Sequence, residues 1–231
     1  DALLEGAFDF ILKPFGKDPA VNKAELVSAL EEKIAAARDG ASETRSYSPI
    51  PVGKRGAKSE VHTDFEAVII GCSTGGPDAL GQILPFLRHD FPLPIVIIQH
   101  MPEGFTSSLS QRLNEASEIE VVEAADGIRL QKGLAILARG GRHLKLVRRG
   151  INHVATQLTD DPREHNFRPA IDYTIRSAVE AFNGPLVTAI LTGMGRDGAE
   201  GSRIVREGGG EVIVQDAESC AVFGMPKSVI L

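Results

Sequence analysis

A serine on a glycine-rich turn is the first place in the sequence where chemistry could occur. Residues 66–71 read as a short apolar β-strand and run directly into Cys72-Ser73-Thr74-Gly75-Gly76. Ser73 is therefore expected on a tight turn at the start of a helix, beside backbone N–H groups that have no partner within the helix. The five residues from Gly71 fit the GxSxG pattern of a nucleophile, but that pattern is common. A serine here can equally cap the helix or hold a phosphate, so both readings stay open.

A serine hydroxyl needs a base before it can attack a carbonyl carbon. One of the six histidines, His100, differs from the rest because it directly follows the apolar strand IVIIQ. The carboxyl ends of parallel strands share one edge of a sheet, so Ser73 and His100 are expected to converge there. A core or surface histidine is the alternative. The other five lie in linkers, connections or short central strands, namely His62, His89, His143, His153 and His165.

An acidic residue follows a third strand. Asp197 lies in the segment LTGMGRDG after the apolar run VTAIL, and the glycines at 193, 195 and 198 allow tight turns. A carboxylate here could hold the tautomer of His100 and stabilise the imidazolium that forms during attack. The alternative is that Asp197 caps a helix beginning near Gly198.

The elements that must position these residues read as an α/β protein. Short β-branched runs alternate with helical stretches, which predicts a doubly wound parallel sheet with helices on both faces. The predicted strands are 67–70, 95–98, 134–137, 186–191 and 212–214. Helices are predicted to begin near Pro77, Thr106 and Pro169, and the last is expected to bury Ile171, Ile175, Ala178, Val179 and Phe182. Closely spaced short strands between residues 118 and 153 predict a small antiparallel insertion.

Composition excludes several classes of protein. The chain has 231 residues, 42% of them hydrophobic, and a net charge of −6 without long runs of one sign. It carries no basic footprint for nucleic acid and no apolar run of the roughly 18 residues that span a bilayer. Two cysteines in apolar or glycine-rich surroundings favour reduced thiols, and with them a cytoplasmic protein. No metal-ligand spacing is recognisable, so neither a metal nor a cofactor is expected.

The chain is expected to have three parts. Residues 1–38 hold a short strand ending in Lys13-Pro14 and an amphipathic helix from Lys23 to Arg38. Residues 39–63 are rich in Gly, Ser and Pro and predict a flexible linker, and residues 64–231 form the main domain. The chain opens on Asp1 without an initiator Met, which indicates a fragment of a longer protein.

Five segments together resemble one family, the chemotaxis response-regulator protein-glutamate methylesterases, or CheB family. They are GCSTGGPDAL, QHM, RPAID, LTGMGRDGA and QDAESC with the following FGMPK, and they cover residues 64–231 in the order of the family. The resemblance implies that Ser73 is the nucleophile, His100 the general base and acid, and Asp197 the orienting carboxylate. It also implies that backbone N–H groups near Thr74 and Met194 hold the oxyanion.

The resemblance further implies an activity, partners and a mode of control. The substrates would be methylated glutamates of methyl-accepting chemotaxis receptors, and deamidation of receptor glutamines is an additional possibility. Residues 1–38 resemble the last strand and helix of a receiver domain, with Lys13 at the phosphoryl group and a histidine kinase as partner of the full-length protein. The phosphoacceptor Asp is absent from this chain. Catalysis by Cys72, a phosphate-binding module and a non-catalytic signalling adaptor are the competing hypotheses.

Overall fold

The computed structural model describes residues 11, 18–41, 65–151 and 153–231. Its strands are β1 Val68–Cys72, β2 Ile95–Gln99, β3 Glu120–Glu123, β4 Leu134–Leu137, β5 His143–Gly150, β6 His153–Thr159, β7 Val187–Ile190 and β8 Glu211–Val214. Its helices are α1 Pro19–Ala41, α2 Gly76–Ile83, α3 Thr106–Ala116, α4 Ile171–Ala181, α5 Ala199–Glu207 and α6 Gly224–Ile230, with a 3₁₀ turn at Leu84–Phe86. All five predicted strands are confirmed to within two residues.

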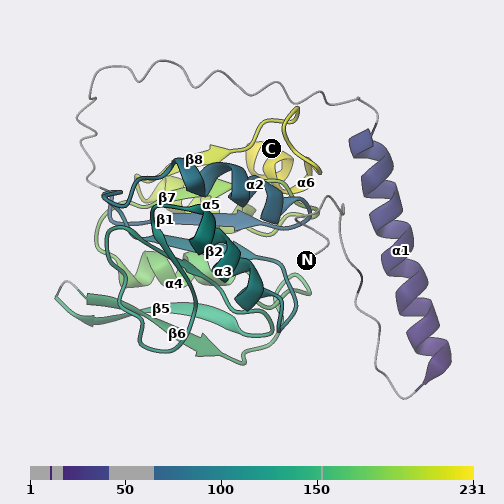
Figure 1. Ribbon diagram of the computed structural model, residues 1–231, viewed down its shortest axis with the longest axis horizontal. Helices are drawn as coiled ribbons and strands as arrows, with labels where there is room; N and C mark the ends of the chain where they lie inside the picture. Colours follow the sequence, from purple (N-terminus) through teal and green to yellow (C-terminus); the bar gives the residue numbers. More distant parts are fainter. Residues whose placement is uncertain (1–10, 12–17, 42–64, 152) are drawn as a thin grey trace.

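Six strands form one parallel sheet in the order β3-β4-β2-β1-β7-β8. The first strand of the sheet in the sequence is therefore central, with β2 on one side and β7 on the other (Figure 1). The chain winds outward from β1 in one direction and later returns to its other side. Such a reversal of strand order opens a crevice at the carboxyl ends of the strands, where ligands of α/β proteins bind.

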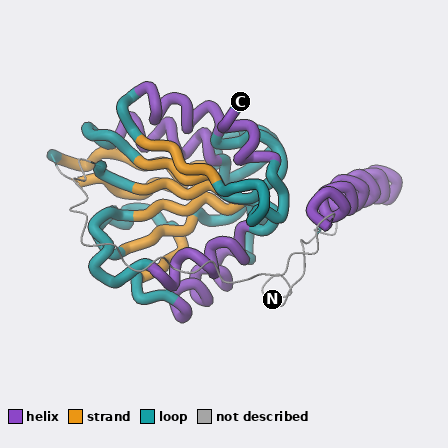
Figure 2. Tube along the Cα trace, turned by 90° about the horizontal axis from the view of Figure 1, so that it is seen from above, coloured by secondary structure: helices purple, strands orange, loops and turns teal. Residues whose placement is uncertain are grey.

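Helices cover both faces of the sheet, as Figure 2 shows. On one face the core joins alternate residues of β1, β2 and β4 to apolar residues of α2 and α3. On the other face the core joins the intervening strand residues to α4, α5, α6 and the β5–β6 hairpin. Because side chains alternate along a strand, a strand buried on both faces reads as a continuous apolar run. The predicted doubly wound fold is confirmed.

The predicted antiparallel insertion is correct in kind but too long at its start. Among the strands of the described residues, β5 and β6 are the antiparallel pair and form a separate two-stranded sheet, and an isolated antiparallel bridge joins Arg129 to Ala155 of β6. Residues 120–123 form β3 instead, an edge strand parallel to β4. Its sequence EVVE has two apolar residues between two glutamates, with Glu120 exposed and Val121 buried, and so it lacks the continuous apolar run of the central strands.

Two helix predictions need correction. In α4 the predicted face is buried at Ile171, Ile175 and Ala178, but Val179 is 37% exposed. The N-terminal helix α1 runs from Pro19 to Ala41 and so includes the first three residues assigned to the linker. The predicted strand near Lys13 and the rest of the linker, residues 42–63, lie outside the described residues. No helix in the described part of the chain is long and apolar enough to cross a membrane.

Candidate active site

Ser73, His100 and Asp197 lie at the carboxyl edge of the three central strands. Ser73 follows β1, His100 follows β2, and Asp197 lies in the loop after β7. The main-chain ladder continues to the first two, because Ser73 N–H donates to Thr192 O at 3.0 Å and His100 N–H donates to Cys72 O at 3.0 Å. Alternation along β1 and β2 directs Ser73 and His100 toward the same face of the sheet, the one that α4 covers. The structure therefore brings the three predicted residues together.

His100 and Asp197 form a buried pair. The Nε2 atom of His100 lies 2.7 Å from Oδ2 of Asp197, and their side chains are 2% and 1% exposed. Burial opposes the charge on Asp197, but hydrogen bonds from His100 and from two backbone N–H groups outweigh it, so the pKa of Asp197 is lowered. A carboxylate accepts hydrogen bonds only, and it therefore holds the ring proton on Nε2. The other ring nitrogen, Nδ1, is left as a basic lone pair.

The N-terminus of α4 fixes the carboxylate of Asp197. Ile171 N–H donates to Oδ2 at 2.7 Å, and Asp172 N–H donates to Oδ1 at 2.9 Å. These are the first residues of α4, where N–H groups lack partners within the helix and the helix dipole favours negative charge. The alternative in which Asp197 caps the next helix is wrong, because α5 begins at Ala199 and its N-cap residue is Gly198, in the left-handed conformation and with no side-chain cap.

An aromatic ring covers the imidazole of His100. Phe167 stacks on it with ring centroids 3.7 Å apart and an angle of 7° between the planes. A tight turn places Phe167, because Glu164 and Phe167 exchange both backbone hydrogen bonds around His165 and Asn166, which have φ values of 51° and 67°. Two consecutive residues with positive φ define a type I′ turn. Sequence analysis missed Phe167, and the only signal was an Asn in a polar stretch before RPAID.

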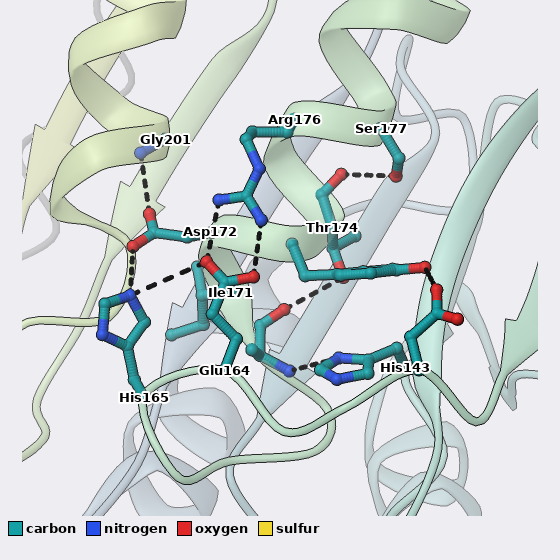
Figure 3. A network of polar contacts seen from close by, with 12 residues as sticks. His143, Glu164, His165, Ile171, Asp172, Thr174, Arg176, Ser177 and Gly201 are labelled. Carbon is teal, nitrogen blue, oxygen red and sulfur yellow. Dashed lines mark hydrogen bonds and ion pairs between the residues drawn. The ribbon is translucent and has the colours of Figure 1, made fainter.

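Figure 3 shows a second pair of a histidine and a carboxylate, His165 and Asp172. His165 Nε2 lies 2.9 Å from Asp172 Oδ2 and 3.9 Å from Asp197 Oδ1. Burial raises the pKa of Asp172, and the negative charge of Asp197 adds to the effect. Glu164, His165 and Asp172 offer ligand atoms within 4.8 Å of one another. However, Arg176 bridges both Glu164 oxygens and Gly201 N–H bonds Asp172, so hydrogen bonding already accounts for this arrangement.

The link between the serine and the histidine is open in this structure. Within the described residues no hydrogen bond joins Ser73 Oγ to His100, and His100 Nδ1 is buried without a partner. The contact expected between His100 and Asp197 is thus present, whereas Ser73 and His100 share one edge of the sheet without a hydrogen bond between their side chains. Such contacts are often long in an unliganded site and tighten when substrate binds. The unused Nδ1 is the atom available to take a proton from Ser73.

Cys72 does not compete with Ser73 as the nucleophile. Its side chain points to the face of the sheet that α2 and α3 cover, is fully buried, and its Sγ lies 3.8 Å from the carbonyl oxygen of Ile98. Burial raises the pKa of this thiol far above its usual range. The thiolate, which is the reactive form, is therefore suppressed, and Cys72 acts as a core residue.

The backbone around Met194 lies beside the serine. A Cβ atom on Gly193 would come within 2.8 Å of Ser73 Cβ and 3.2 Å of Ser73 N, so only glycine fits there. The N–H of Met194, the next residue, makes no hydrogen bond within the described part of the chain. Thr74 is 7% exposed, and its carbonyl oxygen accepts a hydrogen bond from Thr192 Oγ1 at 2.9 Å. Both residues predicted for the oxyanion pocket thus adjoin Ser73 in the chain or in space.

A serine beside a histidine–carboxylate pair, at the carboxyl edge of a doubly wound sheet, is the arrangement of a serine hydrolase. Comparison with known proteins gives the family. The model of the family described as CheB methylesterase matches residues 68–231. The crystal structure of the Thermotoga maritima CheB methylesterase catalytic domain superposes with a TM-score of 0.69 and 46% identity, covering 72% of this chain and 87% of that one. The chain belongs to the CheB methylesterase family.

Full-length relatives extend the similarity. A protein from Desulfotalea psychrophila is 42% identical over 243 residues, which cover 99% of this chain and 66% of the relative. A protein from Thermotoga maritima is 41% identical over 234 residues, which cover 100% of this chain and 66% of the relative. Both are named protein-glutamate methylesterase/protein-glutamine glutaminase. The chain thus spans about two thirds of the length of these curated relatives.

Proposed function

We propose that this chain is the catalytic part of a protein-glutamate methylesterase that removes methyl esters from receptor glutamates in chemotaxis. The observation that carries the proposal is the buried bond between His100 Nε2 and Asp197 Oδ2, located beside Ser73 in a member of the CheB methylesterase family. That bond leaves Nδ1 of His100 as the basic ring nitrogen, and the hydroxyl of Ser73 is the neighbouring group whose proton it would accept. The names of the relatives supply the substrate class.

In the proposed reaction, Ser73 Oγ attacks the carbonyl carbon of the methyl ester while His100 Nδ1 accepts the hydroxyl proton. Asp197 holds the Nε2 proton and stabilises the imidazolium. The oxyanion is held by N–H groups near Thr74 and Met194, each typically worth about 10²- to 10³-fold in rate. His100 then returns its proton to the departing methoxy group, which leaves as methanol and gives an acyl-enzyme.

Water completes the cycle. His100 Nδ1 takes a proton from a water molecule while the water oxygen attacks the acyl carbon. The proton then goes to Ser73 Oγ as the glutamate leaves. The net reaction converts a methyl ester and water into a glutamate and methanol.

Deamidation of glutamine is a second candidate, favoured by the name of the relatives, which includes protein-glutamine glutaminase. An amide differs from the methyl ester in its leaving group, so the same attack would release ammonia rather than methanol. Assaying both products from methylated and from amidated receptor substrates gives the balance between the two activities.

The remaining parts of the proposal concern context. Residues 1–38 are proposed to be the end of a receiver domain, 39–63 a linker and 64–231 the catalytic domain. The proposed partners are methyl-accepting chemotaxis receptors, through their cytoplasmic helical region, and a histidine kinase that acts on the full-length protein. The proposed location is therefore the cytoplasm. Neither nucleic-acid binding nor membrane insertion is part of the proposal.

The test is labelling with a fluorophosphonate probe, which reacts with an activated serine, combined with methanol release from methylated receptor membranes. Ser73→Ala and His100→Ala should nearly abolish both readouts, because nucleophile and base act as a unit. A phosphate-binding module or a non-catalytic adaptor would not be labelled. Labelling that survives in Ser73→Ala would contradict the assignment of the nucleophile.

A further inference from the structure

Gln99 is a buried amide at the end of β2, between the serine turn and the histidine. It is 2% exposed. Ile95 and Ile97 of the same strand belong to the core on the α2 and α3 face, whereas Val96 and Ile98 belong to the core on the α4 face. Alternation therefore sends Gln99 toward α2 and the next residue, His100, toward α4. Gln99 thus reaches beneath the serine turn without entering the space between His100 and Asp197.

The amide nitrogen of Gln99 binds the backbone of both candidate catalytic residues. Its Nε2 donates to Ser73 O at 2.9 Å and to His100 O at 3.1 Å. A primary amide has two N–H donors, and both are used here. Because carbonyl oxygens only accept hydrogen bonds, the reversed amide would place an oxygen against two oxygens, so the orientation of the side chain is fixed.

The amide oxygen of Gln99 makes no such bond. Within the described residues Oε1 is buried and without a hydrogen-bond partner. A Cβ atom on Gly76, the first residue of α2, would lie 2.0 Å from this oxygen. Leaving a buried acceptor unsatisfied typically costs about 1–3 kcal/mol. An apolar side chain would avoid that cost, so the two donated bonds are the feature that an amide supplies here and an apolar residue does not.

The β1–β2 ladder fixes the two strands up to the pair Cys72 and Gln99, and beyond it few contacts in the described residues join the serine turn to the end of β2. The main chain contributes the bond from His100 N–H to Cys72 O, and no side-chain bond joins Ser73 to His100 in the described structure. The Ser73 carbonyl that Gln99 binds also accepts the N–H of Gly76 at 2.8 Å, which closes the turn. The Gln99 amide is therefore shared by the closed turn and the strand end that carries the histidine.

We propose that Gln99 is a positioning residue that holds Ser73 and His100 at the separation needed for proton transfer. The inference rests on the proposed function. Gln99 contacts neither substrate nor a reacting atom, and it acts through the two carbonyl groups alone. Loss of its donors lets the serine turn move relative to β2, and a misplacement of about 1 Å in a catalytic group costs on the order of 10²-fold in rate.

The test is Gln99→Met in the whole chain, since Met nearly conserves the volume and removes both donors. We expect kcat for methanol release and the rate of fluorophosphonate labelling to fall together by about 10- to 100-fold. KM should stay within about twofold, because the substrate is not contacted. If Gln99→Met does not accumulate as folded protein, Gln99→Asn is measured instead, since its side chain is one methylene shorter and cannot reach both carbonyls.

Thr156→Val is the matched control. Thr156 is equally buried, donates through Oγ1 to Ala125 O at 2.5 Å and accepts Ile128 N–H at 2.9 Å, but it lies in β6, away from the serine turn. The Thr156→Val variant should have a lower Tm and an unchanged kcat. A purely structural Gln99 would behave in the same way, so a lower Tm with kcat within threefold of wild type in the Gln99 variant overturns the proposal.

The two readouts separate this proposal from the proposed function. Wild-type protein that is labelled at Ser73 but releases no methanol contradicts the receptor substrate, while the effect of Gln99 on labelling is still scored. Wild-type protein that is not labelled contradicts both. If Gln99→Met lowers the labelling rate and the rate of methanol release by the same factor relative to wild type, both proposals are supported.

Discussion

Gly193→Ala should disable the site by steric displacement of the serine. The added Cβ would lie 2.8 Å from Ser73 Cβ and 2.3 Å from Met225 Sδ. Ordinary carbon–carbon contacts are about 3.5–4.0 Å, so the serine and the Gly193 loop must separate by roughly 0.7 Å or more. Met225 is fully buried and cannot move aside without repacking the core. Met194, the neighbour of the added methyl group, would shift with the loop.

Two magnitudes follow from this geometry. Overpacking of a buried site typically costs about 1–3 kcal/mol in the free energy of unfolding. A catalytic group displaced by about 1 Å loses on the order of 10²-fold in rate. We therefore expect Gly193→Ala to remain folded with a lower Tm and to lose about 100-fold in kcat for methanol release from methylated receptor membranes.

Gly81→Ala is the control for the same chemical change. A Cβ at Gly81 meets nothing within 4 Å, and the residue lies inside α2, where Ala is favoured over Gly by about 1 kcal/mol. This variant should keep wild-type kcat and gain slightly in Tm. If Gly193→Ala retained kcat within threefold of wild type, the close packing of this loop against the serine would not matter for catalysis, and the reasoning would be refuted.

Four further predictions use the same assays. Phe167→Ala removes a stack worth about 0.5–1.5 kcal/mol and should lower kcat about two- to tenfold, and unchanged kcat would contradict a role for the stack. Asp197→Asn should reduce methanol release strongly, and Cys72→Ala should leave it nearly unchanged; the reverse pattern would place the nucleophile at the cysteine. Deleting residues 1–63 should change the rate little, with or without acetyl phosphate, and a large stimulation of the whole chain by acetyl phosphate would count against this. Folding lowers the pKa of Asp197, so its ionised carboxylate stabilises the fold above the ordinary Asp pKa of about 3.9, and this stabilisation is lost as pH falls through the folded pKa. In chemical denaturation below about pH 4, the free energy of unfolding should therefore fall less steeply with decreasing pH for Asp197→Asn than for wild type.

The strands and the positions of the candidate site residues could be predicted because their signals are local. A continuous apolar run such as IVIIQ identifies a strand buried on both faces, and the residue after it lies at the carboxyl edge. Three such strand ends carry Ser73, His100 and Asp197. The edge strand β3 lacked that signal, because its sequence EVVE has only two apolar residues between two glutamates.

The surroundings of the site could not be predicted, because they depend on contacts between distant residues. Nothing local indicates that Asp197 accepts the first N–H groups of α4, 25 residues or more away in the sequence, rather than capping the helix beside it. Phe167 is placed by two consecutive residues with positive φ, His165 and Asn166, and although both residue types are enriched in that conformation, it is uncommon for any residue other than Gly, so the sequence does not identify the turn. The amide of Gln99 was part of a quoted motif, yet its two acceptors become visible only in the folded chain.

The central position of β1 makes the site a reporter of folding. Its three residues follow three neighbouring strands, β2, β1 and β7, and the most distant two, Ser73 and Asp197, are 124 residues apart in the sequence (197 − 73). A partly unfolded chain that has lost the pairing on either side of β1 keeps at most two of the three residues in place. Reactivity toward a fluorophosphonate in increasing urea should therefore decline along the same curve as far-UV ellipticity, which makes the probe a measure of the native fraction in crude mixtures where spectroscopy is impractical.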